Sequence, residues 1–424
     1  MNKPVNYKNK RKYKTAKYPI RQPRFFTWLI WVLSKIMLWK KPHKTECVDM
    51  EEMKAPYLLL SNHMSFVDFE LIAEATYPQR MNNVVNIDGY YMRAWLLEWI
   101  GAICTRKFTS DIHLVKSIRR VLQRGDVLTM YPEARYSPCG TTSFLPDSLG
   151  MLVHMCKVPV VVAIHHGNYL HAPFWNYRQK RRVPMHTVLK PILTAEEAAT
   201  LPVAEINARL KDAFQYDEYR YWQESGFLIT EAYRAEGMHK ILYQCPNCKT
   251  EHQMDSQGAE IFCRACGKRW TLLETGFLQA NEGETEFTHV PDWFEWEREN
   301  VRREVRDGTY HFEDEVDVYS MPRCYRFMPL GRAKVVHDIQ EGFVLEGFYR
   351  GEEYRIQRVP LAINSLHVEY DFPHIKPFDC FDISTEEDSF YCYPTKENVL
   401  TKLAFATEEI FQLHYERTHN KRHQ

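Results

Sequence analysis

Short apolar runs alternate with amphipathic stretches through residues 46–200. A short continuous apolar run is typical of a buried strand, whereas apolar residues at every third or fourth position are typical of a helix. The pattern predicts strands at residues 57–60, 83–87, 102–105, 127–131, 158–164 and 185–189. It predicts helices at residues 91–100, 111–123, 148–157 and 203–219. This alternation favours an α/β fold with a mostly parallel sheet flanked by helices.

The last part of the chain has a different pattern. Beyond residue 300, short aromatic and β-branched runs at residues 343–349, 354–359 and 365–370 are separated by glycine-rich or acidic turns. This pattern predicts a small antiparallel barrel or sandwich, closed by a helix at residues 396–414. We find no site chemistry in it and interpret it as a β-rich packing or adaptor domain.

Residues 25–39 are apolar over most of a helical circumference and contain several tryptophans. Their polar residues Thr27 and Ser34 lie seven apart, on one helical face, and lysines or arginines flank the segment. The run is shorter than the roughly 18–20 residues needed to cross a bilayer, and no small-residue cleavage site precedes Lys40. We therefore expect a helix that lies in the membrane interface, the alternative being a helix that packs on the body of the protein.

Charge and composition refine this organisation. The chain has 424 residues and a formal net charge of zero, yet residues 1–24 carry nine Lys or Arg and no Asp or Glu. A neutral chain gives no overall field that would attract nucleic acid, and we expect no nucleic-acid partner. We expect four parts: a basic tail with an interfacial helix at residues 1–45, an α/β domain at residues 46–237, a metal-binding ribbon at residues 238–276, and a β-rich domain with a C-terminal helix at residues 277–424.

Two CxxC pairs stand out among the eleven cysteines. Cys245 and Cys248 are separated by fourteen residues from Cys263 and Cys266, and Gly267 follows the second pair. Four thiolates at this spacing are typical of a zinc ribbon with a closed, tetrahedral structural Zn²⁺ site. A closed site has no open coordination position, so we assign it no catalytic role.

The run at residues 61–68 carries the main candidate chemistry. His63 and Asp68 follow the apolar run at residues 57–60, which we predict to be a strand. Parallel sheets bind their ligands at the edge formed by the carboxyl ends of the strands, where these residues would lie. Ser65 is positioned to cap a helix with Asp68 in its first turn, so the carboxylate can turn back toward the imidazole. Such a pair can act as a general base. The alternative is an ordinary capping box with a nearby histidine.

Other charged residues follow the strands predicted next in the sheet. Arg106 ends the strand at residues 102–105, and Glu133 and Arg135 follow the strand at residues 127–131. Arginine side chains at the same edge of the sheet suit a phosphate group. Each residue also has a purely structural interpretation: Arg106 would be a surface charge, and Glu133 and Arg135 would form a local ion pair. His165 and His166 also follow a strand, and we interpret them as structural.

Together these segments resemble the lysophospholipid (1-acylglycerol-phosphate) acyltransferase family over residues 46–200. The N-H-x-S-x-x-D block is matched by Asn62, His63, Ser65 and Asp68, and a block ending in arginine by residues 101–106. Residues 131–137 approximate an aromatic-Pro-Glu-Gly-Thr-Arg-Ser block, and residues 158–161 approximate a Val-Pro-Ile-Val strand. The third block lacks the Gly-Thr between acid and arginine, and the lysine often found shortly after it is missing.

The resemblance implies transfer of an acyl group from acyl-CoA, acyl-ACP or an acyl phosphate to a lysophospholipid such as lysophosphatidic acid, in phospholipid biosynthesis. His63 would be the general base and Asp68 its orienting partner. Arg106, Glu133 and Arg135 would position the acceptor phosphate. Asn62, or backbone N–H groups at Ser65, would stabilise the oxyanion.

Substrates of this kind reside in membranes, so the N-terminal segment predicts a peripheral or monotopic protein at the cytoplasmic face of the cell membrane. An alternative from another class is a membrane-associated scaffold with a degenerate acyltransferase core, in which the ribbon and the β-rich domain bind a partner. The altered third block and the two additional modules motivate this alternative.

Overall fold

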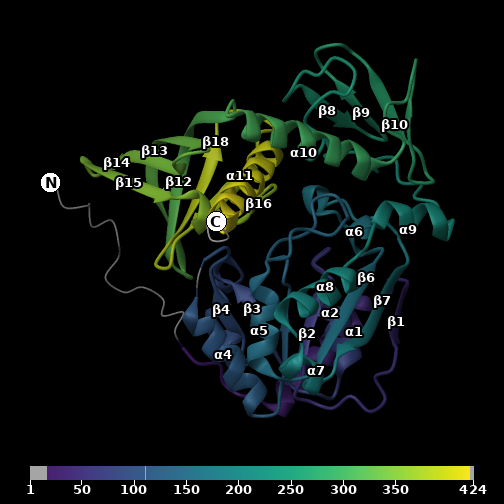
Figure 1. Ribbon diagram of the computed structural model, residues 1–424. Coiled ribbons are helices and arrows are strands. Elements are labelled where there is room, and N and C mark those ends of the chain that lie inside the picture. The colour runs from purple at the N-terminus through teal and green to yellow at the C-terminus, as the bar shows by residue number, and fades with distance from the viewer. Residues whose placement is uncertain (1–16, 110, 421–424) are drawn as a thin grey trace. The chain divides into compact units, whose positions relative to one another are not determined.

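A computed structural model describes residues 17–109 and 111–420 and divides the chain into two compact units (Figure 1). Among the described residues, the N-terminal unit contains residues 17–105 and Asp111–Glu231. The C-terminal unit contains residues 106–109 and 232–420. The short segment at residues 106–109 follows a strand of the N-terminal unit but belongs to the other unit.

The N-terminal unit is built on one seven-stranded sheet of order β1-β7-β6-β2-β5-β3-β4. Its strands are β1 (His43–Cys47), β2 (Leu58–Ser61), β3 (Met81–Asn86), β4 (Ile103–Thr105), β5 (Val127–Met130), β6 (Val160–His166) and β7 (Met185–Leu193). Every neighbouring pair is parallel except β6 and β7. The predicted mostly parallel sheet is confirmed. The carboxyl ends of β2, β5 and β6 and the start of β7 therefore share one edge.

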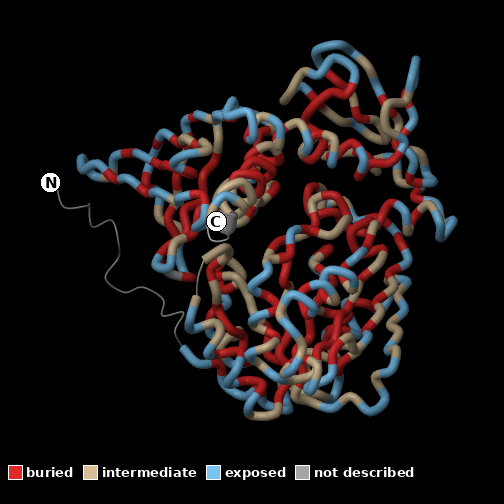
Figure 2. Tube along the Cα trace, viewed as in Figure 1, coloured by how far each residue is buried: buried red, intermediate tan, exposed pale blue. Residues whose placement is uncertain are grey.

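Helices cover both faces of this sheet because successive strand residues point to opposite sides. Leu58 and Leu60 of β2 pack with α4 (Ile112–Gln123), α5 (Ser148–Cys156) and α8 (Val203–Ala213). Leu59 packs on the opposite side with α2 (Asp68–Thr76) and α1 (Arg24–Leu38). Figure 2 shows the buried residues concentrated along the strands and the inner sides of these helices.

Most predicted elements of the N-terminal unit agree with the observed ones to within a few residues. The short helices α6 (Asn168–His171) and α7 (Ala195–Thr200) were not predicted. The strand β1 was not predicted, because its residues His43–Cys47 are mostly polar and form only an edge of the sheet. The helix predicted at residues 203–219 is two helices, α8 and α9 (Glu218–Ser225), with Asp217 capping the second. The break places Glu218 in the first turn of its own helix.

Helix α1 is amphipathic, but it buries polar residues and exposes large apolar ones, the opposite of a normal surface helix. Its buried residues are Thr27, Ser34 and Leu38, while Phe25 and Ile36 are 61% and 60% exposed. Other large apolar side chains on or beside the helix are also exposed, namely Trp28, Leu33, Met37 and Trp39. Within the described residues, no helix is both long and apolar enough to cross a bilayer.

The C-terminal unit contains two further sheets. One is four-stranded, with order β11-β10-β9-β8, and contains β8 (Met254–Gln257), β9 (Glu260–Cys263), β10 (Arg269–Leu272) and β11 (Leu278–Ala280). The other is seven-stranded and antiparallel, with order β15-β14-β13-β12-β18-β17-β16. Its strands are β12 (His311–Arg323), β13 (Arg326–Asp338), β14 (Gly342–Tyr349), β15 (Glu352–Arg358), β16 (His367–Glu369), β17 (Cys380–Ser384) and β18 (Ser389–Pro394). The β-rich prediction is confirmed, but the expected barrel or sandwich is one open sheet.

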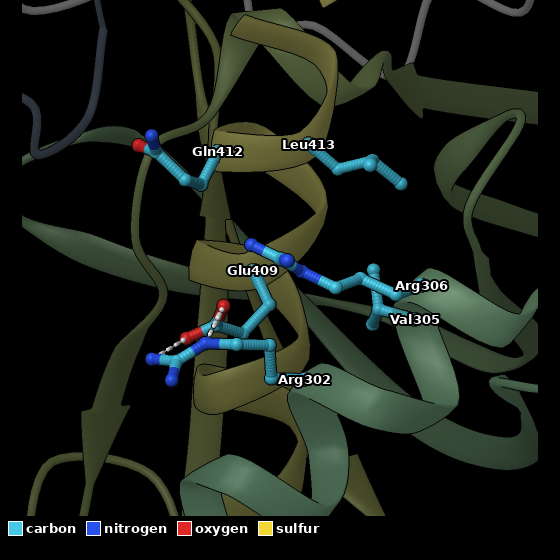
Figure 3. A pocket seen from close by; sticks show the side chains of 6 residues that line it. All are labelled: Arg302, Val305, Arg306, Glu409, Gln412 and Leu413. Carbon is cyan, nitrogen blue, oxygen red and sulfur yellow. Dashed lines mark hydrogen bonds and ion pairs between the residues drawn. The ribbon is translucent and has the colours of Figure 1, made fainter. Parts of the chain in front are cut away.

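Two long helices, α10 (Val290–Asp307) and α11 (Leu400–Asn420), pack against each other in the same unit. Arg298 and Arg302 of α10 form ion pairs with Glu408 and Glu409 of α11 at 2.6 and 2.8 Å. A small pocket lies between the helices and is lined by Arg302, Val305, Arg306, Glu409, Gln412 and Leu413 (Figure 3). The Arg302–Glu409 pair is explained by helix packing, so we assign the pocket no function.

Candidate active site

His63 and Asp68 lie together where β2 ends. The Nδ1 atom of His63 is 3.0 Å from Oδ2 of Asp68, and the imidazole is 18% exposed while the carboxylate is fully buried. The backbone carbonyl of His63 accepts a hydrogen bond from the Ser137 N–H at 2.8 Å, which ties this turn to the loop after β5. The imidazole is therefore held by its Nδ1 atom and retains access to solvent, as a general base requires.

The Asp68 carboxylate accepts three hydrogen bonds besides that of His63. The donors are the backbone N–H groups of Met64 and Ser65, at 2.7 and 3.0 Å, and the Asn168 amide at 2.7 Å. Burial opposes ionisation of this carboxyl, but His165, His63 and Asn168 outweigh burial and lower the pKa of Asp68. Asp68 is therefore an ionised partner for His63 near neutral pH.

The helix after this turn does not begin as predicted. Helix α2 starts at Asp68, its N-cap is Val67, and no side chain caps it. The prediction that Ser65 caps the helix is wrong, because Asp68 itself turns back and binds the Ser65 N–H. Ser65 is buried, and its hydroxyl has no hydrogen-bond partner among the described residues.

Aromatic rings enclose the His63 imidazole. The ring of Tyr131 stacks on it at a centroid distance of 4.0 Å, and Tyr136 lies on it at 3.8 Å. Tyr136 in turn contacts Phe66 and Phe174, at 5.3 and 4.5 Å. The two tyrosines restrict the imidazole to one orientation and limit the water around it. Both lie in the third block, but no sequence pattern indicated that they would flank His63.

Asn62 is fully buried, and its side chain joins β2 to β6. Its amide donates to the His165 carbonyl at 3.1 Å, and its Oδ1 atom accepts the His165 N–H at 2.8 Å. The N–H of Ser65 is bound to Asp68. The groups expected to stabilise an oxyanion thus make internal hydrogen bonds, and their observed role is to shape the turn that carries His63.

Glu133 and Arg135 follow β5 and are buried. The Glu133 carboxylate accepts hydrogen bonds from the Tyr216 hydroxyl and the Ser143 N–H, each at 2.9 Å. Burial raises the pKa of Glu133 to about 7, although these donors and Arg135 oppose the rise. Ala134, between Glu133 and Arg135, has a φ of 55°, which is in the left-handed region. The corresponding block of the resembling family carries glycine after the glutamate. Glu133 therefore braces this loop from within.

Arg106 makes its contacts in the C-terminal unit. Its guanidinium donates to the Ser389 hydroxyl at 2.8 Å and to the Glu387 carbonyl at 3.2 Å. Arg106 was expected to hold a substrate phosphate beside His63. The contacts observed here instead connect the segment at residues 106–109 to the turn between β17 and β18.

The four cysteines of the predicted ribbon converge in space. The Sγ atoms of Cys245 and Cys266 are 3.8 Å apart, those of Cys248 and Cys263 are 3.7 Å apart, and all four lie within 4.8 Å of one another. Zn–S bonds of about 2.3 Å in a tetrahedron separate sulfurs by about 3.8 Å. The donor set and its spacing therefore fit a tetrahedral metal ion.

Asn168 is a further site residue that sequence reasoning missed. It lies 100 residues after Asp68, and no local motif marks it. It reaches the carboxylate because β6, which precedes it, pairs in parallel with β2 and ends at the same edge. Only knowledge of the strand order would have indicated this contact.

Comparisons with known proteins agree with the N-terminal site. Residues 42–190 match a family model described as Acyltransferase, which supports an acyltransferase domain in the N-terminal unit. No curated protein matches the chain. Among solved structures, the 1-acyl-sn-glycerophosphate (LPA) acyltransferase PlsC from Thermotoga maritima is similar to it, with 14% identity and a TM-score of 0.37 over 45% of this chain and 77% of that chain. A TM-score this low adds no argument of its own.

Proposed function

We propose that the N-terminal unit transfers an acyl group from a thioester or acyl phosphate to the hydroxyl of a lysophospholipid such as lysophosphatidic acid. The observation that carries this proposal is the 3.0 Å contact between His63 and a fully buried Asp68, within the residues that match the acyltransferase family model. The neighbouring tyrosines support it, because a partly enclosed base is protected from water.

The chemistry follows from the hydrogen bonds of the imidazole. Because Asp68 accepts the Nδ1–H of His63, the lone pair that takes the proton of the acceptor hydroxyl is that of the Nε2 atom. The acceptor oxygen attacks the thioester carbonyl, the C–S bond breaks, and the thiolate leaves with the proton returned by His63. The ionised Asp68 stabilises the imidazolium between these steps. No covalent acyl-enzyme is required.

The test is an acyl-transfer assay with purified full-length protein, lysophosphatidic acid and a panel of acyl-CoA, acyl-ACP and acyl phosphate donors. Wild type should transfer the acyl group from at least one donor, and His63→Gln should be slower by about 10³-fold or more. Equal turnover by the two proteins would contradict the proposal. Absence of turnover by both, with every donor, would favour the scaffold alternative.

We propose that α1 binds a membrane surface, at the cytoplasmic face, and its reversed amphipathicity supports the membrane contact. Its apolar side faces outward, and the ring of Phe26 lies 6.3 Å from that of Trp99, whose helix α3 (Ala94–Trp99) also exposes Trp95. Exposed apolar patches of this kind mark interaction sites, and tryptophan suits the lipid interface.

Membrane binding can be tested by flotation with anionic vesicles. Trp28→Glu should reduce binding strongly, because it places a charge on the outward side of α1. Met151→Glu is the matched control: Met151 is 56% exposed, but its helix α5 covers the opposite face of the sheet. Equal binding by wild type and both variants would refute the membrane role of α1.

We also propose that the four cysteines hold a structural Zn²⁺. Both CxxC turns close in the same way: the Lys249 N–H donates to the Cys245 backbone carbonyl and the Gly267 N–H donates to the Cys263 backbone carbonyl, each at 2.9 Å. Cysteine sulfurs would occupy all four coordination positions of the ion. The ion would therefore stabilise the fold of the C-terminal unit and take no part in acyl transfer. Elemental analysis should find one zinc per chain. Iron in its place, or no metal in wild type, would refute this assignment.

A further inference from the structure

A second histidine–carboxylate pair lies at the same edge of the N-terminal sheet. His166 is the last residue of β6, and its Nδ1 atom is 3.1 Å from Oε1 of Glu218. Glu218 is fully buried in the first turn of α9, and the imidazole is 24% exposed and stacks on the ring of Tyr221 at 4.8 Å. The arrangement matches that of His63 and Asp68, and both imidazoles are partly exposed, so the geometry supports a functional role for His166 as well.

The turn after β6 connects the two pairs. The Gly167 N–H donates to Oε2 of Glu218 at 2.6 Å, and the next residue, Asn168, donates to Asp68 at 2.7 Å. Gly167 has a φ of 81°, and a Cβ atom on it would lie 2.1 Å from the Pro184 carbonyl. Only glycine fits this turn. Two consecutive residues therefore place the second pair beside the first, at the edge where the acyl acceptor would bind.

The two carboxylates differ in how their charge is balanced. Asp68 accepts three hydrogen bonds from neutral donors, whereas Glu218 has only the Gly167 N–H besides His166 among the described residues. Burial raises the pKa of Glu218, and the His166 contact opposes that rise. Glu218 holds the ring of His166 by its Nδ1 atom, so the Nε2 atom lies on the side of the ring away from the carboxyl.

Other ionisable groups surround this histidine. His186 of β7 is its cross-strand partner, and Lys44 of β1 is in turn the partner of His186. Glu46 binds both of these, at 3.0 Å from Lys44 and 3.3 Å from His186. Further titratable groups near the pair are Tyr221, His165 and Asp217. The row Lys44, His186 and His166 places three basic side chains in register across three strands, which suits a multiply charged anion.

We propose that His166, held by Glu218, binds the phosphate group of the acyl acceptor. This inference rests on the proposed acyltransferase function and names the group that orients its substrate. Of the residues first expected to hold the phosphate, Arg106 binds Ser389, Glu133 binds Tyr216, and Arg135 is buried near Glu133. A donor at Nε2 of His166, one strand away from His63, would fix the phosphate while the acceptor hydroxyl reaches the base.

Binding is tested first without catalysis. The full-length protein, labelled at its histidine rings, is titrated with inorganic phosphate and with glycerol 3-phosphate and followed by NMR. The His166 signals, assigned by their loss in His166→Gln, should shift and saturate with both ligands, and more weakly in Glu218→Gln. His113, an exposed histidine on α4, provides the control signal and should not shift. Unchanged His166 signals would overturn the proposal whether or not the protein is an acyltransferase.

Kinetics then identify the source of the phosphate. His166→Gln should raise the KM for lysophosphatidic acid by about 10- to 100-fold, the range for a lost charged hydrogen bond, and change kcat much less. The KM for the acyl donor and for an unphosphorylated monoacylglycerol should stay the same, and His113→Gln should match wild type. A rise in the donor KM alone, or an equal rise with the monoacylglycerol, would overturn the assignment to the acceptor phosphate.

Discussion

The N-terminal unit contains two histidine–carboxylate pairs with nearly the same geometry and different surroundings. His63 and His166 each use Nδ1 to contact a fully buried carboxylate, at 3.0 and 3.1 Å. Three neutral donors support Asp68, and a single backbone N–H supports Glu218. The pKa of Asp68 is lowered because hydrogen bonds and nearby charge outweigh burial, whereas burial prevails at Glu218 and raises its pKa.

This difference shows how a fold can assign separate roles to two similar pairs. A carboxylate that amide groups support well stays ionised, so it can orient a base and stabilise the imidazolium that forms. A buried carboxyl with few donors ionises less readily, so it holds its histidine in position without supporting a base in the same way. The hydrogen bonds behind each imidazole, more than the imidazole itself, decide what it does.

The largest expected difference comes from removing the charge of each carboxylate. Asp68→Asn should lower kcat by on the order of 10³- to 10⁴-fold, because the amide favours the wrong tautomer of His63 and does not stabilise the imidazolium. Glu218→Gln should change kcat by less than about threefold and raise the KM for lysophosphatidic acid by about tenfold. Steady-state kinetics measure both. Similar losses of kcat in the two variants would remove the distinction between the pairs.

A smaller effect is expected from Asn168→Ala, which removes one of the three neutral donors of Asp68. We expect kcat to fall by about tenfold with little change in KM, since one hydrogen bond to a charged group is lost. The matched control is Asn176→Ala, which removes a local contact to Gln179 at 2.8 Å. If both variants behave alike in the acyl-transfer assay, Asn168 does not support the base.

Glu133 extends the comparison to a buried carboxylate without a histidine partner. Burial raises its pKa to about 7 from a usual value of 4.5, so the folded protein holds this proton more tightly than the unfolded chain. Its stabilising contribution is complete below pH 4.5 and is lost as the pH rises to about 7. The Tm of Glu133→Gln relative to wild type should therefore increase by a few degrees from pH 4.5 to pH 8. An unchanged difference would place the carboxyl pKa near its usual value.

Much of the N-terminal fold could be predicted from the sequence. The apolar runs before His63 and Glu133 are short and continuous, as expected for strands buried on both sides, and the turn residues limit their length. The edge strand β1 is polar and gave no such signal. The extent of the C-terminal sheet was underestimated, because the long strands β12 and β13 contain charged residues along most of their length.

The candidate site was only partly predictable, for a physical reason. His63 and Asp68 lie five residues apart, so a single turn brings them together and the sequence shows it. The Asn168 contact and the His166–Glu218 pair depend on strand order and on α9, which lie far away in sequence. Arg106 shows the converse, since a residue that directly follows a strand of the N-terminal sheet belongs to the C-terminal unit and makes its contact with Ser389 there.

The most direct test of the account compares His63→Gln with His166→Gln in a single-turnover acyl transfer at saturating lysophosphatidic acid. Saturation removes differences in acceptor binding, so the rate reports the chemical step alone. The account predicts that His63→Gln slows this step by about 10³-fold or more, while His166→Gln stays within about threefold of wild type. Loss of the step in His166→Gln, or its retention in His63→Gln, would contradict the assignment of His63 as the base.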